Sequence, residues 1–141
     1  MLVCIRRSAA EALITHARAD APRECCGLMI GHQTLVERVV PAVNVRASDV
    51  SYLIDPRDHF AAIRAARSEG LSVVGGYHSH PRSQALPSAT DLAESAGPGF
   101  LYVIVAPAFR DGWRLGAFFL LSRPGDSVAG NFLEVPLVPV A

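Results

Sequence analysis

Apolar residues recur along the chain at both strand and helix spacing, and the first such pattern predicts a strand followed by a helix. Residues 2–6 form a short apolar strand segment. Leu13, Ile14 and Ala17 then recur at helical spacing, which predicts a helix over about residues 9–19. Ser8 is placed to cap this helix, and Pro22 closes it.

A hairpin and a second helix are predicted next. Residues 26–30 form a short apolar run that ends at Gly31, and strand character resumes over residues 34–40, which suggests a hairpin. Asp55 followed by Pro56 is a strong helix start, with a cap and then a first helical residue. This helix should run to Glu69 and end at Gly70.

The remaining pattern is richer in strands. We expect a strand over residues 71–77, a loop over 81–87, and a helix over about 89–96 that begins after Ser88. The most apolar segments, 100–106 and 113–121, are predicted to be neighbouring strands in the centre of the sheet. Residues 132–140 suggest one edge strand interrupted by proline. This mixture indicates an α/β (α+β) layered domain, with a sheet flanked by helices.

Composition restricts the kinds of partner. The 141 residues fit one domain, residues 1–141, and half of them are apolar. Charged residues make up 18% and cancel to zero net charge, which provides no electrostatic footprint for nucleic acid or an anionic membrane. No apolar run approaches the ~20 residues that span a bilayer, and we find no signal-peptide pattern. We therefore expect a cytoplasmic protein.

His78 and His80 lie at the end of a predicted strand. Side chains at positions i and i+2 of a strand share a face, so both imidazoles can bind one tetrahedral ion. Asp91 falls in the first turn of the helix predicted after Ser88, where the helix dipole favours a carboxylate. Three such ligands leave a fourth position open for water, which is typical of a catalytic zinc site.

Two further residues can complete a hydrolytic site. Glu24 precedes an apolar strand and can reach in as the proton acceptor for an attacking water. The Ser88 hydroxyl can donate to a developing oxyanion, although capping of the following helix uses the same oxygen.

The pattern Glu24, His78-Ser79-His80, Ser88 and Asp91 resembles the JAMM motif, also called MPN+, of zinc isopeptidases. The resemblance implies a mixed sheet related to that of cytidine deaminases, with one Zn²⁺ per chain bound by His78, His80 and Asp91. It also implies that Glu24 is the general base and that Ser88 stabilises the oxyanion. Family members cleave peptide or isopeptide bonds after the glycine tail of ubiquitin-like proteins. The compact chain resembles stand-alone prokaryotic members, some of which act on sulfur-carrier proteins.

The sequence fits two other functions less well. A non-catalytic scaffold of the same fold is disfavoured because all five motif residues are present. A zinc deaminase requires a His-x-Glu and a Pro-Cys-x-x-Cys pair, and neither occurs. The sequence does not indicate the oligomeric state or the identity of the carrier.

Roles were also expected for residues outside the motif. Gly75 and Gly76 suit close backbone approach or a bulge near the site. A further hypothesis is that a substrate tail pairs there as an added strand. Cys25 and Cys26 are expected to be small buried side chains. An odd cysteine count with two adjacent thiols makes a poor disulfide framework, so we expect reduced thiols. His16, His32 and His59 are expected to be ordinary surface residues.

Overall fold

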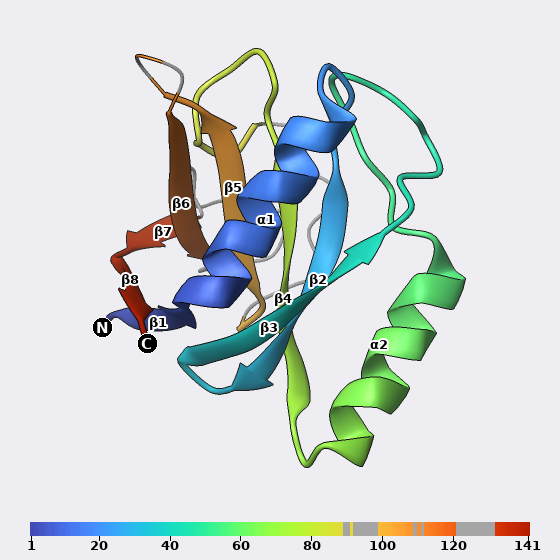
Figure 1. The fold of residues 1–141 in the computed structure, drawn as a ribbon, viewed down its shortest axis with the longest axis vertical. Coiled ribbons are helices and arrows are strands. Elements are labelled where there is room, and N and C mark those ends of the chain that lie inside the picture. The colour runs from blue at the N-terminus through green and yellow to red at the C-terminus, as the bar shows by residue number, and fades with distance from the viewer. Residues whose placement is uncertain (89–90, 92–98, 109, 111, 121–131) are drawn as a thin grey trace, which may run out of the picture.

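The computed structural model describes residues 1–88, 91, 99–108, 110, 112–120 and 132–141. Within them it has a mixed eight-stranded sheet with two helices packed against it (Figure 1). The strand order is β7-β6-β5-β4-β2-β3-β1-β8. This confirms the predicted α+β class with a mixed sheet. The elements in chain order are β1 (Val3–Arg6), α1 (Arg7–Asp20), β2 (Cys26–His32), β3 (Leu35–Ala42), α2 (Pro56–Ser68), β4 (Ser72–Ser79), β5 (Leu101–Pro107), β6 (Trp113–Leu120), β7 (Phe132–Val135) and β8 (Leu137–Val140).

Helix α1 covers one face of the sheet and is close to its predicted extent. Leu13 and Ala17 are buried against the strands, as the helical spacing predicts. The prediction that Ser8 caps α1 is wrong, because the N-cap residue is Arg6, which makes no side-chain capping bond. Strand β1 runs directly into α1, so Ser8 lies inside the first turn of the helix.

Helix α2 begins where the Asp55-Pro56 pair predicts. The carboxylate of Asp55 accepts a hydrogen bond from the backbone N–H of Arg57 at 2.9 Å, and Pro56 is the first helical residue. The helix packs against β4, β2 and β3. Within the described part of the chain, no helix combines the length and the apolar character needed to cross a membrane.

The predicted hairpin is present, since β2 and β3 pair antiparallel. Strands β5 and β6 are antiparallel neighbours, as predicted, but the prediction that they occupy the centre of the sheet is wrong. The centre is formed by β4 and β2, which have partners on both sides. The strand that carries His78 is therefore held rigidly in the middle of the sheet.

The predicted single edge strand over residues 132–140 is instead two strands at opposite ends of the sheet. Strand β7 pairs with β6, whereas β8 pairs in parallel with β1. Only Pro136 separates them, and its carbonyl accepts a hydrogen bond from Val3 N at 2.9 Å. A one-residue link between the two edges requires that the sheet curl strongly, and β7, β8 and β1 lie together in Figure 1.

The two faces of β4 contain different groups. Tyr77 belongs to the core that α1 covers, together with residues such as Leu13 and Val103. Because side chains alternate along a strand, His78 points to the opposite face. On that face β5 and β6 contribute a second, partly aromatic cluster that includes Tyr102 and Phe118. The candidate site therefore lies on the face of the sheet away from α1.

Candidate metal centre and catalytic site

The two histidines meet at the end of β4, as their spacing predicts. His78 lies within the strand and His80 just beyond it, and their Nε2 atoms are 3.1 Å apart. Both rings are buried, at 1% and 5% relative exposure. The pairing of β4 with β2 and β5 fixes the strand that presents them.

Asp91 joins the two histidines from a segment after the loop. Its Oδ1 atom lies 3.1 Å from His78 Nε2, and its Oδ2 atom lies 3.1 Å from His80 Nε2. Ser88 holds it there, because Ser88 N donates to Asp91 Oδ2 at 2.8 Å and Asp91 N donates to Ser88 Oγ at 3.0 Å. This reciprocal pair is the capping arrangement that the spacing predicts. Asp91 is helical, and the rest of the helix predicted over 89–96 lies outside the described residues.

Hydrogen bonding of His80 determines which ring nitrogen faces the site. The carbonyl oxygen of Gln84 lies 2.9 Å from His80 Nδ1 and can only accept, so Nδ1 carries the proton. In the neutral ring, Nε2 then directs a lone pair at a carboxylate oxygen and at His78 Nε2. A backbone carbonyl on the outer nitrogen is the usual partner of a metal-binding histidine. A cation between these three groups would satisfy them all.

Charges within the site shift the protonation of its members. Burial would raise the pKa of Asp91, but the hydrogen bonds with His78 and His80 hold it well below its usual range. Burial lowers the pKa of His78. For His80, burial opposes the charged form, while the hydrogen bond with Asp91 raises the pKa above its ordinary value. An ionised carboxylate beside a neutral imidazole is a donor set suited to a divalent ion.

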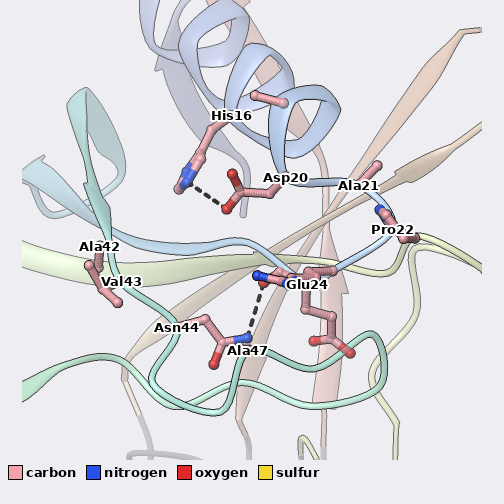
Figure 2. Close-up of a pocket in the computed structure, with 11 residues that line it drawn as sticks. His16, Asp20, Ala21, Pro22, Glu24, Ala42, Val43, Asn44 and Ala47 are labelled. Carbon is pink, nitrogen blue, oxygen red and sulfur yellow. Dashed lines mark hydrogen bonds and ion pairs between the residues drawn. The ribbon is translucent and has the colours of Figure 1, made fainter.

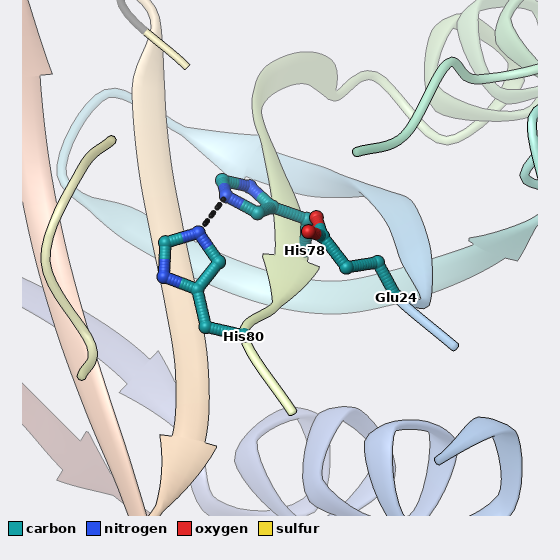
Figure 3. A group of neighbouring side chains, drawn as sticks. All are labelled: Glu24, His78 and His80. Atoms are coloured by element: carbon teal, nitrogen blue, oxygen red, sulfur yellow. Dashed lines mark hydrogen bonds between the residues drawn. The ribbon is translucent and has the colours of Figure 1, made fainter. Parts of the chain in front are cut away.

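Glu24 approaches the histidines from the segment just before β2, as Figure 3 shows. It is buried, and single ligand atoms of Glu24, His78 and His80 all lie within 4.8 Å of one another. Its Oε1 atom has no hydrogen-bond partner among the described residues. Burial raises the pKa of Glu24 to about 7; His80 opposes this shift, and the charge of Asp91 adds to it. A carboxyl group in this state can both take up and release a proton near neutral pH.

Tyr52 is a site residue that the sequence pattern does not reveal. Its ring stacks on His78, with centroids 4.4 Å apart and an interplanar angle of 20°. It also lines a cavity of about 300 Å³ that reaches Asp91. The other lining residues are Leu28, Arg46, Leu53, Ile54, His59, Gly76, Phe100 and Tyr102. Tyr52 comes from a loop between β3 and α2, and no local motif marks it.

The expectation that a substrate tail pairs as a strand at Gly75 and Gly76 is wrong. Both residues lie in β4, whose two edges are already paired with β2 and β5. The expected close backbone approach is present, since a Cβ at Gly75 would lie 2.0 Å from the Leu101 carbonyl oxygen. A Cβ at Gly76 would meet the Phe100 ring at 3.4 Å, on the face that lines the cavity.

His16 is not the ordinary surface residue that was expected. Its ring is half-buried, with Nδ1 2.7 Å from the Tyr77 hydroxyl and Nε2 3.3 Å from Asp20 Oδ2. Figure 2 shows His16 and Asp20 lining a second cavity, of about 590 Å³, which extends to Glu24 and Asn44. His32 and His59 are exposed, as predicted.

The three cysteines are free, and Cys25 and Cys26 are fully buried, as predicted. Burial raises the pKa of Cys25 to about 11 and that of Cys26 to about 12. Neither thiol is therefore available as a nucleophile.

A buried cluster of two histidines and two carboxylates, on the face of a curled mixed sheet away from α1, defines a candidate metallohydrolase. The sequence model of the prokaryotic homologues of the JAB domain matches residues 6–116. The chain therefore belongs to this family, which confirms the resemblance inferred from the motif.

Several characterised proteins are similar to the chain. The desampylase of Haloferax volcanii is 38% identical over 109 residues, which span 72% of this chain and 78% of that protein. A probable TtuB-protein conjugate cleaving protease of Thermus thermophilus is 40% identical over 96 residues, covering 67% of this chain and 64% of that protein. The CysO-cysteine peptidase of Mycobacterium tuberculosis is 33% identical over 107 residues, covering 74% and 73%.

The fold also matches solved structures. A protein from Desulfitobacterium hafniense superposes with a TM-score of 0.84 at 27% identity, covering 99% of this chain and 93% of that one. A protein from Salinibacter ruber superposes with a TM-score of 0.69 at 31% identity.

Proposed function

We propose that this protein is a zinc-dependent peptidase that hydrolyses the bond after the C-terminal glycine tail of a ubiquitin-like or sulfur-carrier protein. The observation that carries the proposal is the convergence of Glu24, His78, His80 and Asp91 in a member of this family. The relatives support the substrate class, because they are named as a desampylase, a TtuB-conjugate protease and a CysO-cysteine peptidase.

His78, His80 and Asp91 would hold one Zn²⁺ per chain. Their facing atoms are 3.1 Å apart in each pair. Ligand atoms around a tetrahedral zinc with bonds of 2.0–2.1 Å are separated by about 3.3 Å, so the donors fit the ion. A zinc ion bound there would supply Lewis-acid activation of water and of the scissile carbonyl.

Glu24 would move the proton. Its carboxylate accepts a proton as the water oxygen adds to the carbonyl carbon, and returns it to the amine nitrogen when the C–N bond breaks. Burial supports this role because it brings the pKa of Glu24 to about 7. The Ser88 hydroxyl accepts from Asp91 N, which leaves its own hydrogen free to donate to the carbonyl oxygen as negative charge develops.

The cavity beside Gly76 suits the tail of the carrier. An extended glycine tail is narrow, and Asp91 is among the residues that line this cavity. The tail would therefore lie across the face of β4 rather than along a strand edge. The partner of the enzyme would be a protein substrate of this class. We expect the enzyme to act as one domain in the reducing cytoplasm, where its three free thiols persist.

The proposal is tested with the purified protein and a fusion of a ubiquitin-fold sulfur carrier, ending in Gly-Gly, to a reporter peptide. We expect about one zinc per chain by mass spectrometry, and cleavage after Gly-Gly that a chelator stops and added zinc restores. Glu24→Gln should keep the metal and lose cleavage. Full cleavage by metal-free protein, or by Glu24→Gln, would contradict the mechanism.

The non-catalytic scaffold has less support. A scaffold has no need of a buried carboxylate beside two histidines whose Oε1 atom has no hydrogen-bond partner among the described residues, and Glu24 provides one. In the same assay a scaffold would bind the carrier without releasing the reporter.

A further inference from the structure

The side-chain amide of Asn44, just after β3, organises the loop that follows. Its Nδ2 group donates to Glu24 O at 3.0 Å and to Ser51 O at 3.1 Å. Its Oδ1 atom accepts from Arg46 N at 3.1 Å and from Leu53 N at 3.0 Å. The segment 44–54 is therefore folded around one amide, and the same amide binds the backbone of Glu24.

The backbone of Glu24 is held by this segment on both sides. Glu24 N donates to Ser48 O at 2.7 Å, and Glu24 O accepts from Asn44 Nδ2. Glu24 precedes β2, so the strand ladder does not hold it. In Figure 2 the Asn44 amide points to the backbone carbonyl of Glu24, while the Glu24 carboxylate extends away from this amide. The Oε1 atom of Glu24 has no hydrogen-bond partner among the described residues, so this oxygen has no hydrogen bond to fix it, and its position depends on where the backbone is held.

The same segment also forms one wall of the cavity that reaches the metal ligands. Arg46, Tyr52 and Leu53 line it, together with Gly76 and Phe100. Tyr52 additionally stacks on His78. The segment therefore contacts the space for a substrate with some of its residues and Glu24 with others.

We infer that Asn44 is a positioning residue that ties segment 44–54, which contributes Arg46, Tyr52 and Leu53 to the cavity lining, to the general base and so holds Glu24 in register with a substrate in the cavity. This inference rests on the proposed function. A carboxylate must lie within hydrogen-bond reach of the proton it abstracts, and a shift of about 1 Å can lower a rate ~100-fold. Asn44 does not touch the reacting atoms, so it acts through Glu24.

Two substitutions distinguish the role of the Nδ2 donor of Asn44 from that of its Oδ1 acceptor. Asn44→Asp keeps an acceptor for Arg46 N and Leu53 N, but it replaces the donor that faces Glu24 O and Ser51 O with an oxygen. Asn44→Ala removes all four bonds. Val50→Ala is the matched control, because Val50 belongs to the same segment and is 73% exposed.

Steady-state cleavage of the carrier fusion gives the first readout. For Asn44→Asp we expect kcat to fall about 10- to 100-fold, with KM within about threefold of wild type, because the cavity wall keeps its turn. For Asn44→Ala we expect kcat to fall and KM to rise as well. Val50→Ala should match wild type. Zinc content should be unchanged in all three, since no metal ligand is altered. A wild-type kcat for Asn44→Asp would overturn the inference.

Amide hydrogen exchange of the metal-free protein, followed by NMR, gives a second readout that needs no activity. The Glu24 amide should exchange at least about tenfold faster in Asn44→Asp and Asn44→Ala than in wild type or Val50→Ala, because its bond to Ser48 O opens more often. Unchanged exchange in both Asn44 variants would refute the positioning role even if wild type cleaves no carrier. If the wild type bound no zinc and cleaved no carrier, but the Glu24 amide still exchanged faster in the Asn44 variants, the proposed function would be refuted and the link from Asn44 to Glu24 would be supported.

Discussion

At the scale of single residues, Ser79 joins the two strands that carry the site. It lies between His78 and His80, and its buried Oγ atom accepts from Cys25 N at 2.8 Å. Its own N–H donates to Cys25 O at 3.1 Å. These bonds extend the pairing of β2 with β4 by one residue, directly beside Glu24. Ser79 thus keeps Glu24 and the two histidines in a common frame.

Ser79→Ala should destabilise the protein. The substitution leaves the Cys25 N–H buried without its acceptor, which costs about 1–3 kcal/mol. Urea unfolding followed by circular dichroism should show the loss as a lower midpoint at unchanged slope. Ser79→Thr retains the acceptor oxygen and should recover most of the stability. Equal midpoints for wild type and Ser79→Ala would show that another group satisfies the Cys25 amide.

The residues that carry chemistry could be predicted from the sequence more readily than those that position them. His78, His80, Ser88 and Asp91 lie close together along the chain, at spacings that reflect a strand end and a helix start. Tyr52 and Asn44 have no such signature. Their contacts arise only when the loop after β3 folds against β2 and β4, and a one-dimensional pattern contains no trace of that contact.

At the scale of elements, the strongest local signals were read correctly. Asp55-Pro56 marks the start of α2, because a cap and a fixed backbone angle act within one turn. The assignment of residues 132–140 to one edge strand failed for a different reason. The pairing partners of β7 and β8 depend on how far the sheet curls, and the curl is a property of all eight strands together. The order of the strands likewise depends on the whole sheet. The apolar character of residues 100–106 and 113–121 therefore predicted the wrong strands for its centre.

The cap of α2 leads to a pH-dependent prediction. Hydrogen bonds from Arg57 lower the pKa of Asp55 below its usual value of 3.8, so folding favours the ionised carboxylate. Its contribution is complete above about pH 4 and is lost as the pH falls through the lowered pKa of the folded state. Asparagine also caps helices but does not titrate.

Asp55→Asn should therefore melt below wild type at pH 6, and the gap should shrink as the pH is lowered toward 2.5. Thermal unfolding of both proteins across this range measures the gap. Arg57→Gln provides the control, because it removes the charged partner and should flatten the pH dependence of the difference. A gap that stays constant across the range would mean that Asp55 does not contribute through its charge.

At the scale of the whole molecule, the candidate site draws its residues from three separate parts of the chain. Glu24 comes from the segment just before β2, the histidines from the end of β4, and Asp91 from a segment after the loop. The first two parts are joined by the central strand pair. Asp91 is joined to them by its contacts with the histidines, so an ion at this point would tie that segment to the sheet.

Zinc should accordingly stabilise the entire fold, and the ligand set can be determined from that effect. An ion at about 100 times its dissociation constant adds roughly 2.7 kcal/mol to the free energy of unfolding. For a domain of this size the Tm should rise by about 10 °C. His80→Ala and Asp91→Ala should abolish this rise, because each removes a proposed ligand. Glu24→Gln should retain it, since Glu24 moves a proton in the proposed mechanism and does not bind the ion.

The distinction matters because Glu24, His78 and His80 themselves form a group compact enough to hold a metal. Differential scanning fluorimetry of the four proteins, with zinc and with chelator, separates the two ligand sets. If Glu24→Gln lost the thermal shift while Asp91→Ala kept it, Glu24 would be the third ligand. Proton transfer would then have to be assigned to another group, and the ionised Asp91 beside the histidines would be the nearest carboxylate for that role.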